Sequence, residues 1–229
     1  STYFKKKYFQ RSKKNQVLVE YFNYKPSLIN YSLLSNILAE KYDAELIVYD
    51  PNFKNLKGRI FFYIRNMIQP FNVLFLYKCF GVCNFLRPHI LKKKFYNIYV
   101  KNKSSFINFR FKKVLVGDLI YDEYLRKENK FTIEINSISF KNHLNESLRL
   151  FDFWHNYLKK NNVKSIIVSH TVYNMGIIPR IGLKFRIPVY VTGPNGIQRL
   201  SKEYYTKHSS EEFKRFPKIF NTFSKIERA

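Results

Sequence analysis

The sequence predicts an α/β domain in which a parallel β-sheet is flanked by helices, and residues 165–196 carry the clearest evidence. A short apolar, β-branched run at 165–169 is typical of a buried parallel strand, and residues 187–192 repeat that pattern. Between them, residues 177–185 place apolar side chains at helical spacing. Strand, helix and strand within about thirty residues form a βαβ unit, whose right-handed crossover brings both strand ends to one edge of the sheet.

A second unit of the same kind opens the chain. Residues 16–22 read as an apolar strand, and residues 45–49 read as the next one. Pro26 and Ser27 mark the start of a helix over 28–42 between these strands. The helix is expected to pack on the sheet through one apolar face, made of Ile29, Leu33, Leu34, Ile37 and Leu38.

The middle of the chain is expected to add helices and one strand. Polar residues interrupt the apolar runs of residues 58–103 before any run is long enough to span a bilayer. Short amphipathic helices are therefore expected there, which either cover the sheet or attach to an anionic membrane. Residues 112–116 are expected to form a third parallel strand, followed by helices over 119–127 and 140–160.

Along its length the chain is expected to have three parts. Residues 1–15 form a basic tail, and residues 16–200 form the α/β domain. Residues 201–229 form a helical segment that leads toward a further domain after the last residue.

Charge is the strongest compositional signal. The chain carries 41 Lys and Arg against 16 Asp and Glu, a formal net charge of +25, and no acidic residue lies between Asp50 and Asp118. Such a surface attracts nucleic acid, anionic lipid headgroups and phosphorylated substrates. The two cysteines, Cys79 and Cys83, support neither a disulfide framework nor a zinc site, so a reducing, cytoplasmic compartment and no metal are expected.

Four predicted strand ends meet at one edge if the sheet is parallel, and this convergence defines the candidate site. It gathers residues 23–26, 117–118, 169–173 and 193–196. His170 is the first candidate for a catalytic base acting on a hydroxyl, since histidine titrates near neutral pH. The alternative is a loop histidine that bonds the backbone.

Two carboxylates, Asp118 and Asp122, share a face of the helix that follows the third predicted strand. Either could deprotonate an acceptor or orient a sugar, whereas carboxylates near a helix N-terminus also serve as partners of the helix dipole. Arg180 either clamps a phosphate or carboxylate or is a solvated helix residue. The substrate-binding candidates are Arg180, Tyr173, Gly193, Asn195, Gly196 and Asn23.

Several signatures are missing from the sequence. The turn at 193–196 is not G-x-G-x-x-G and has no Walker lysine, so it either approaches a ligand through its backbone or is only a turn. The sequence also has no H-E-x-x-H, G-x-S-x-G or kinase signature, which argues against proteases, esterases and kinases.

Three groups of residues carry a resemblance to a known family. They are residues 17–20 with Pro26 and Ser27; residues 117–122 with 124–126; and residues 169–170 with Tyr173, Gly176, Arg180 and 187–189. Together they resemble the N-terminal half of bacterial capsular or surface-polysaccharide glycosyltransferases of the GT-B type. The resemblance implies two Rossmann-like domains, of which the first mostly binds the acceptor and the second binds the nucleotide sugar.

The resemblance further implies an enzyme that uses no metal or other cofactor and sits on the inner face of the cell membrane. The expected function is therefore the acceptor side of sugar transfer from a nucleotide sugar to a surface glycan or lipid-linked acceptor. The alternative is a non-catalytic basic module that binds nucleic acid or an anionic membrane, although no RRM, KH, zinc-finger or helix-turn-helix signature is present.

Overall fold

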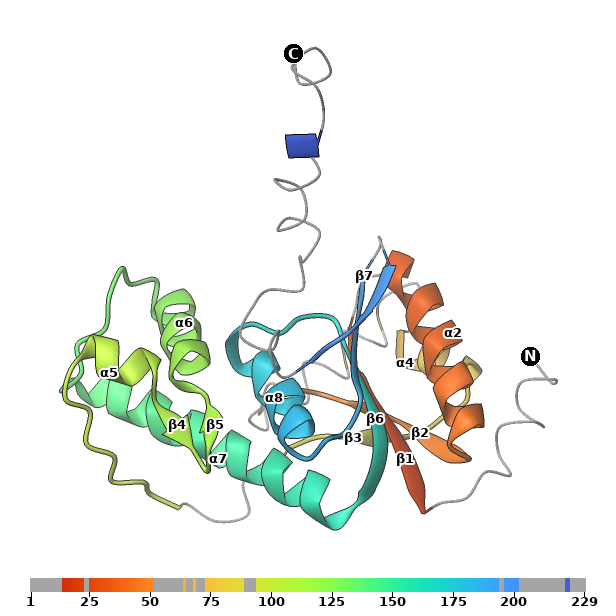
Figure 1. Ribbon diagram of the computed structural model, residues 1–229, viewed down its shortest axis with the longest axis horizontal. Helices are drawn as coiled ribbons and strands as arrows, with labels where there is room; N and C mark the ends of the chain where they lie inside the picture. Colours follow the sequence, from red (N-terminus) through yellow and green to blue (C-terminus); the bar gives the residue numbers. More distant parts are fainter. Residues whose placement is uncertain are drawn as a thin grey trace.

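A computed structural model of the chain describes residues 14–22, 25–51, 64, 68, 73–88, 94–193, 196–201 and 221–222. Its centre is a six-stranded sheet in the order β3-β2-β1-β6-β7-β8 (Figure 1). The strands are β1 (Asn15–Glu20), β2 (Ala44–Tyr49), β3 (Val82–Leu86), β6 (Asn162–Val168), β7 (Val189–Gly193) and β8 (Gly196–Arg199). All neighbouring strands pair in parallel except β7 and β8, which are antiparallel. The predicted α/β fold, Rossmann-like with helices around a mostly parallel sheet, is confirmed.

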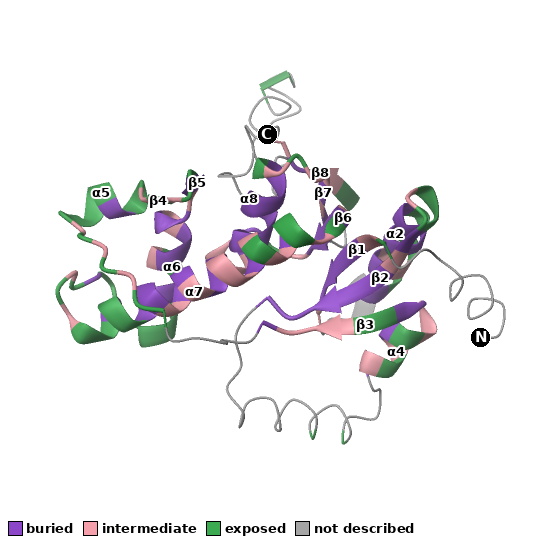
Figure 2. Ribbon diagram, turned by 90° about the horizontal axis from the view of Figure 1, so that it is seen from below, coloured by how far each residue is buried: buried purple, intermediate pink, exposed green. Residues whose placement is uncertain are grey.

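Helices cover both faces of the sheet because each buried strand alternates its side chains between them. Val17 and Val19 of β1 pack in the layer of α2 (Lys25–Lys41) and α4 (Val73–Cys79). Leu18 faces the opposite layer, which holds α7 (Ile138–Lys160) and α8 (Ile177–Lys184). Figure 2 shows the buried sheet between these helices.

A lobe packs on the N-terminal half of α7, beside the sheet (Figure 1). It consists of α5 (Lys103–Ile107), β4 (Arg110–Phe111), β5 (Val114–Leu115) and α6 (Gly117–Glu128). Aromatic rings hold it in place, with Phe106 and Tyr124 meeting Phe140 of α7 edge-on at centroid distances of 5.0 and 5.3 Å. The long helix α7 therefore joins the sheet to this lobe.

The predicted third parallel strand at 112–116 was wrong. Val114–Leu115 instead pairs with Arg110–Phe111 in a separate antiparallel hairpin. Its two-residue turn is Lys112 and Lys113, whose φ values are 47° and 66°. Turns with two positive φ angles usually contain Asn or Gly, so a pair of lysines gives no recognisable hairpin signal.

Other differences concern the sheet edges and α2. The strands β3 and β8 were not predicted; both are short edge strands with several exposed residues. On α2, Leu34 and Leu38 are buried as expected, but Ile29, Leu33 and Ile37 are 69%, 61% and 55% exposed. This helix is apolar on most sides, so periodicity alone does not select the face that packs.

The predicted parts at the two ends fall mostly outside the described residues. Of the tail at 1–15 only Lys14 and Asn15 are described, and Asn15 begins β1. Of the segment at 201–229 only residues 201, 221 and 222 are described. Within the described part of the chain, no helix combines the length and apolarity needed to cross a bilayer.

Gly117→Ala is expected to lower the free energy of unfolding by about 3 kcal/mol. An added Cβ would lie 1.7 Å from the carbonyl oxygen of Phe106 and 2.9 Å from the amide nitrogen of Phe109, and backbone atoms cannot move aside as a side chain can. Urea denaturation followed by circular dichroism measures the loss. The control is Gly182→Ala, whose Cβ first meets the flexible Cδ1 of Ile166 at 2.7 Å. Equal losses in the two variants would contradict the backbone explanation.

Candidate functional site

A buried carboxylate lies where the strand order of the sheet reverses. Glu20 is the last residue of β1 and is 1% exposed. Its Oε2 accepts hydrogen bonds from the amide of Ser169 at 2.5 Å and from the hydroxyl of Ser169 at 2.9 Å. Ser169 directly follows β6, the parallel neighbour of β1. Ligands of open α/β sheets bind at this kind of switch point.

His170 continues this hydrogen-bond chain. Its Nδ1 lies 2.7 Å from the Oγ of Ser169. Because the Ser169 hydroxyl donates its proton to Glu20, its oxygen accepts from Nδ1–H, and Nε2 then keeps its lone pair. The ring also packs edge-on against Phe22, with a centroid distance of 5.5 Å. The arrangement presents Nε2 as a proton acceptor.

Burial sets the direction of the pKa shifts in the hydrogen-bond chain formed by Glu20, Ser169 and His170. Burial raises the pKa of Glu20 to about 7; hydrogen bonds from Ser169 and the amide of His170 oppose the shift, and the nearby charge of Asp50 adds to it. Desolvation lowers the pKa of His170 below its usual 6.5, so its imidazole is neutral at pH 7. A neutral imidazole is the form that acts as a base.

Tyrosines surround the Glu20 carboxylate from the side of α2, β2 and α4. The Tyr77 hydroxyl donates to the carbonyl of Glu20 and accepts from the amide of Phe22, both at 3.1 Å. Burial raises the pKa of Tyr31 and Tyr49, and the charge of Glu20 raises it further, so both stay protonated. These contacts fix the backbone at the end of β1.

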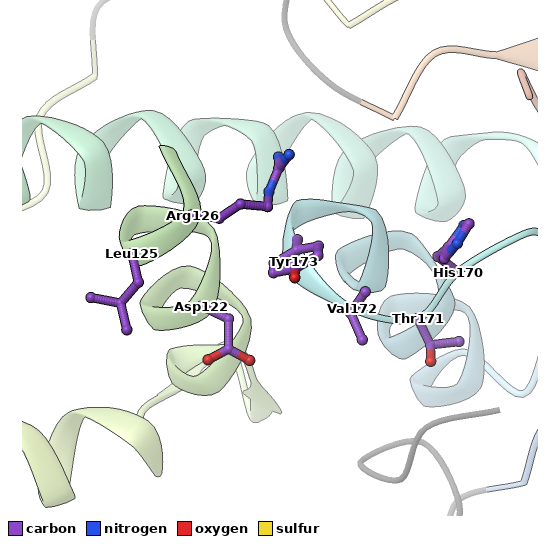
Figure 3. A pocket seen from close by; sticks show the side chains of 7 residues that line it. All are labelled: Asp122, Leu125, Arg126, His170, Thr171, Val172 and Tyr173. Atoms are coloured by element: carbon purple, nitrogen blue, oxygen red, sulfur yellow. The ribbon is translucent and has the colours of Figure 1, made fainter. Parts of the chain in front are cut away.

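A pocket of about 600 Å³ opens between α6 and the segment after β6. Its described lining residues are Asp122, Leu125, Arg126, His170, Thr171, Val172 and Tyr173. Figure 3 shows Tyr173 between Asp122 of α6 and His170, with the Leu125 side chain pointing away from them. The structure thus brings three predicted site residues, Asp122, His170 and Tyr173, to one cavity.

Tyr173 begins a short 3₁₀ helix, η1 (Tyr173–Gly176), in a constrained conformation. Its φ of 54° is left-handed, which is uncommon for a bulky residue and occurs often at ligand sites. The guanidinium of Arg126 lies 4.8 Å from the centre of its ring. Glu123 in turn binds Arg126 through both carboxylate oxygens, each at 2.9 Å. The tyrosine ring is therefore held in place by α6.

Asp118 and Arg180 contact each other outside the described lining of the pocket. Two hydrogen bonds of 2.6 and 2.7 Å join the groups, and Arg180 also donates to the carbonyl of Leu115 at 2.9 Å. The Arg180 side chain is 4% exposed. Each charge is compensated by the other, so this geometry favours a structural clamp between α6 and α8 over the predicted roles of Asp118 as a base and Arg180 as a phosphate ligand.

The remaining predicted residues do not form a ligand loop in the described structure. Gly193 and Gly196 are opposite each other at the turn between β7 and β8, and Gly196 has a φ of 147°. This is a β-hairpin, not a loop that leads into a helix N-terminus. Asn195 and Asn23 lie outside the described residues.

Sequence reasoning missed Glu20 as a site residue, and it placed Ser169 at the candidate edge without giving it a role. The signal for Glu20 was its place at the end of the apolar run 17–19, at the carboxyl edge of the predicted sheet. A carboxylate there is buried and needs donors, which the next parallel strand supplies. Within the described residues, no group of three or more His, Cys, Asp or Glu is placed to hold a metal ion.

Comparisons of the chain with models of protein families, with curated proteins and with solved structures found no match.

Glu20→Gln is expected to remove a pH dependence of stability. Between pH 4.5 and about 7 the folded state keeps a proton on Glu20 that the unfolded chain releases, so the free energy of unfolding falls as pH rises. This shift corresponds to about 3 kcal/mol. Glutamine does not titrate but keeps an acceptor for Ser169. The variant is expected to match the wild type near pH 4.5 and to exceed its stability by up to about 3 kcal/mol at pH 8.

Denaturation curves of both proteins from pH 4.5 to 8 test this expectation. Glu128→Gln, a change on the exposed part of α6, is the control and should follow the wild type. Parallel curves for Glu20→Gln and the wild type would show that Glu20 does not carry a raised pKa.

Asp118→Ala is expected to lower the free energy of unfolding by about 3 kcal/mol, because it leaves the buried guanidinium of Arg180 without its carboxylate. Urea denaturation measures the loss. The double variant Asp118→Ala/Arg180→Met is expected to recover part of that loss. Glu146→Ala, which removes an exposed ion pair with Lys127, is the control and should change stability by less than about 1 kcal/mol. Strictly additive losses in the double-mutant cycle would contradict the clamp.

Proposed function

We propose that this chain is the acceptor-binding part of a glycosyltransferase that moves a sugar from a nucleotide sugar to a surface glycan or lipid-linked acceptor. The observation that carries the proposal is the hydrogen-bond chain from Glu20 through Ser169 to His170, beside the pocket. It supports His170 as the base, because its Nε2 keeps a lone pair next to a cavity where an acceptor hydroxyl can bind.

In this mechanism Nε2 of His170 removes the proton of the acceptor hydroxyl. The hydroxyl oxygen forms a bond to the anomeric carbon of the donor sugar, and the bond from that carbon to the phosphate oxygen breaks. The nucleotide leaves with the bonding electrons, as a diphosphate or a monophosphate according to the donor. The positive charge that develops on the imidazole is stabilised by Glu20 through the Ser169 hydroxyl, which serves the role that a carboxylate serves for other catalytic histidines.

The proposal includes attachment to the inner face of the membrane. Its support is the basic segment between Asp50 and Asp118, of which Lys101, Lys103 and Arg110 are described and exposed. Anionic lipid attracts such a surface and holds the enzyme next to a lipid-diphosphate acceptor.

His170→Asn is expected to lower the rate of sugar transfer by about a hundredfold or more, the usual contribution of a general base. Transfer is measured from radiolabelled UDP-, GDP- and CMP-linked sugars to lipid extracts and oligosaccharides. The wild-type rate is expected to rise with pH and to level only above pH 7, where His170 is neutral and Glu20, whose pKa is about 7, has ionised. His155→Asn is the control and should keep the wild-type rate, because this half-buried histidine of α7 packs against Phe151 and Phe185 and is not part of the described pocket lining.

Two results would count against the proposal. An unchanged rate of sugar transfer in His170→Asn would show that His170 is not the catalytic base. Absence of transfer from every donor, together with tight binding of random-sequence RNA at physiological salt, would favour a basic nucleic-acid-binding module instead.

A further inference from the structure

We infer that residues 94–101 form a docking strand for an extended acidic segment of a partner protein, which pairs with the backbone edge of these residues. The inference goes beyond the proposed function, because none of these residues belongs to the described lining of the pocket. It follows from the extended shape of the segment, from its unpaired backbone and from the charges beside it.

The segment has the side-chain alternation of a β-strand. It leads to α5 without a helix, turn or bend, and Figure 1 shows it as the yellow trace that reaches this helix. Tyr96, Ile98 and Val100 are partly buried and pack against the core. Phe95 and Tyr99, which alternate with them, are 72% and 88% exposed. A period of two is that of an extended chain with one face on the core.

The backbone of this segment is almost unpaired. Within the described residues it makes one hydrogen bond, in which the amide of Tyr96 donates to Oδ1 of Asn145 in α7 at 2.6 Å. Successive amides of an extended chain point to opposite edges, so those of residues 95, 97, 99 and 101 lie on the edge away from Asn145. These four residues are exposed. An edge of unpaired donors and acceptors is what an incoming strand pairs with.

Side chains hold the segment in this shape before a partner binds. The hydroxyl of Tyr96 donates to Oδ2 of Asp152 in α7, and its ring meets Phe111 edge-on at a centroid distance of 5.4 Å. Lys94 and Lys112 bind the same carboxylate, at 3.5 and 2.6 Å. Because the segment is already ordered, little conformational entropy is lost when a strand pairs with it.

The charges beside the edge favour an acidic occupant. Lys101 and Lys103 are exposed, and neither forms an ion pair within the described part of the chain. A second copy of the segment would bring lysines against lysines, and lysines on a strand edge oppose such self-pairing. An extended segment that carries Asp or Glu meets opposite charge instead, and opposite charges across a strand pair are stabilising.

Nucleic acid and anionic lipid are attracted by the same lysines. Neither has alternating donors and acceptors at the spacing of an extended backbone. The unpaired edge therefore favours a peptide strand over both, and charge alone would not distinguish the three.

Fluorescence anisotropy on the complete chain at physiological salt tests this inference. The probe is a blocked, labelled peptide in which glutamate and valine alternate. It is compared with the same peptide N-methylated at every amide and with a peptide in which lysine and valine alternate. The glutamate peptide is expected to bind, and the other two are not. The N-methylated peptide keeps the charge, so its failure to bind assigns the affinity to backbone pairing.

Asn97→Pro is expected to weaken binding of the glutamate peptide about fivefold, because proline removes one backbone donor and still favours an extended chain. Asn97→Ala keeps the amide and is the matched control. Lys101→Glu/Lys103→Glu is expected to weaken binding about tenfold. Lys159→Glu/Lys160→Glu makes the same change of charge at the exposed end of α7 and should bind as the wild type does. Circular dichroism confirms that each variant is folded.

The outcomes separate this inference from the proposed function. Equal binding of the glutamate peptide and its N-methylated form, or equal affinities of Asn97→Pro and Asn97→Ala, overturns the inference and leaves a surface that attracts anions by charge alone. Binding of random-sequence RNA or phosphatidylglycerol vesicles that depends on Lys101 and Lys103, with no binding of the glutamate peptide, also overturns it. Sugar transfer is decided by the His170→Asn assay, whichever of these results is found.

Discussion

The buried carboxylate of Glu20 ties together the two strands at which the sheet reverses its order. An isolated carboxylate in such a place is costly to bury, and the amide and hydroxyl of Ser169 supply the donors that make its burial tolerable. The same two hydrogen bonds fix the start of the segment after β6. The position of His170, and with it one wall of the pocket, depends on this contact, whereas the ring of Tyr173 is also held by Arg126 of α6.

The opposite wall depends on a second buried charge. Arg180 of α8 binds Asp118 at the start of α6 and so fixes the N-terminal end of the helix that carries Asp122 and Arg126. A buried ion pair contributes little net stability when both partners must lose their water, but it strongly disfavours arrangements that separate them. In this protein the pair, together with the aromatic contacts to Phe140, defines where the lobe docks. The two sides of the pocket are thus set by two electrostatic contacts between residues far apart in sequence.

This distance in sequence explains what could be predicted. The βαβ units were readable because periodicity and strand ends are local signals, and they placed His170 at the correct edge of the sheet. The partnership of Asp118 with Arg180 spans 62 positions, and that of Glu20 with Ser169 spans 149. No local pattern encodes such pairs, so Asp118 and Arg180 read as separate reactive groups and Glu20 was overlooked. The hairpin of β4 and β5 was not predicted for a different reason. Lys112 and Lys113 in its turn both have positive φ angles, which lysine seldom adopts.

The two edge strands of the sheet, β3 and β8, limit association between copies of the protein. A long, flat edge strand would offer free backbone groups to another chain and would invite aggregation. β8 has four residues, begins with a glycine and ends with an exposed arginine, and it runs against its neighbour. At the far edge, β3 has five residues with a polar middle. Both borders are therefore poor templates for strand addition, which keeps a chain with 45% hydrophobic residues from joining others edge to edge.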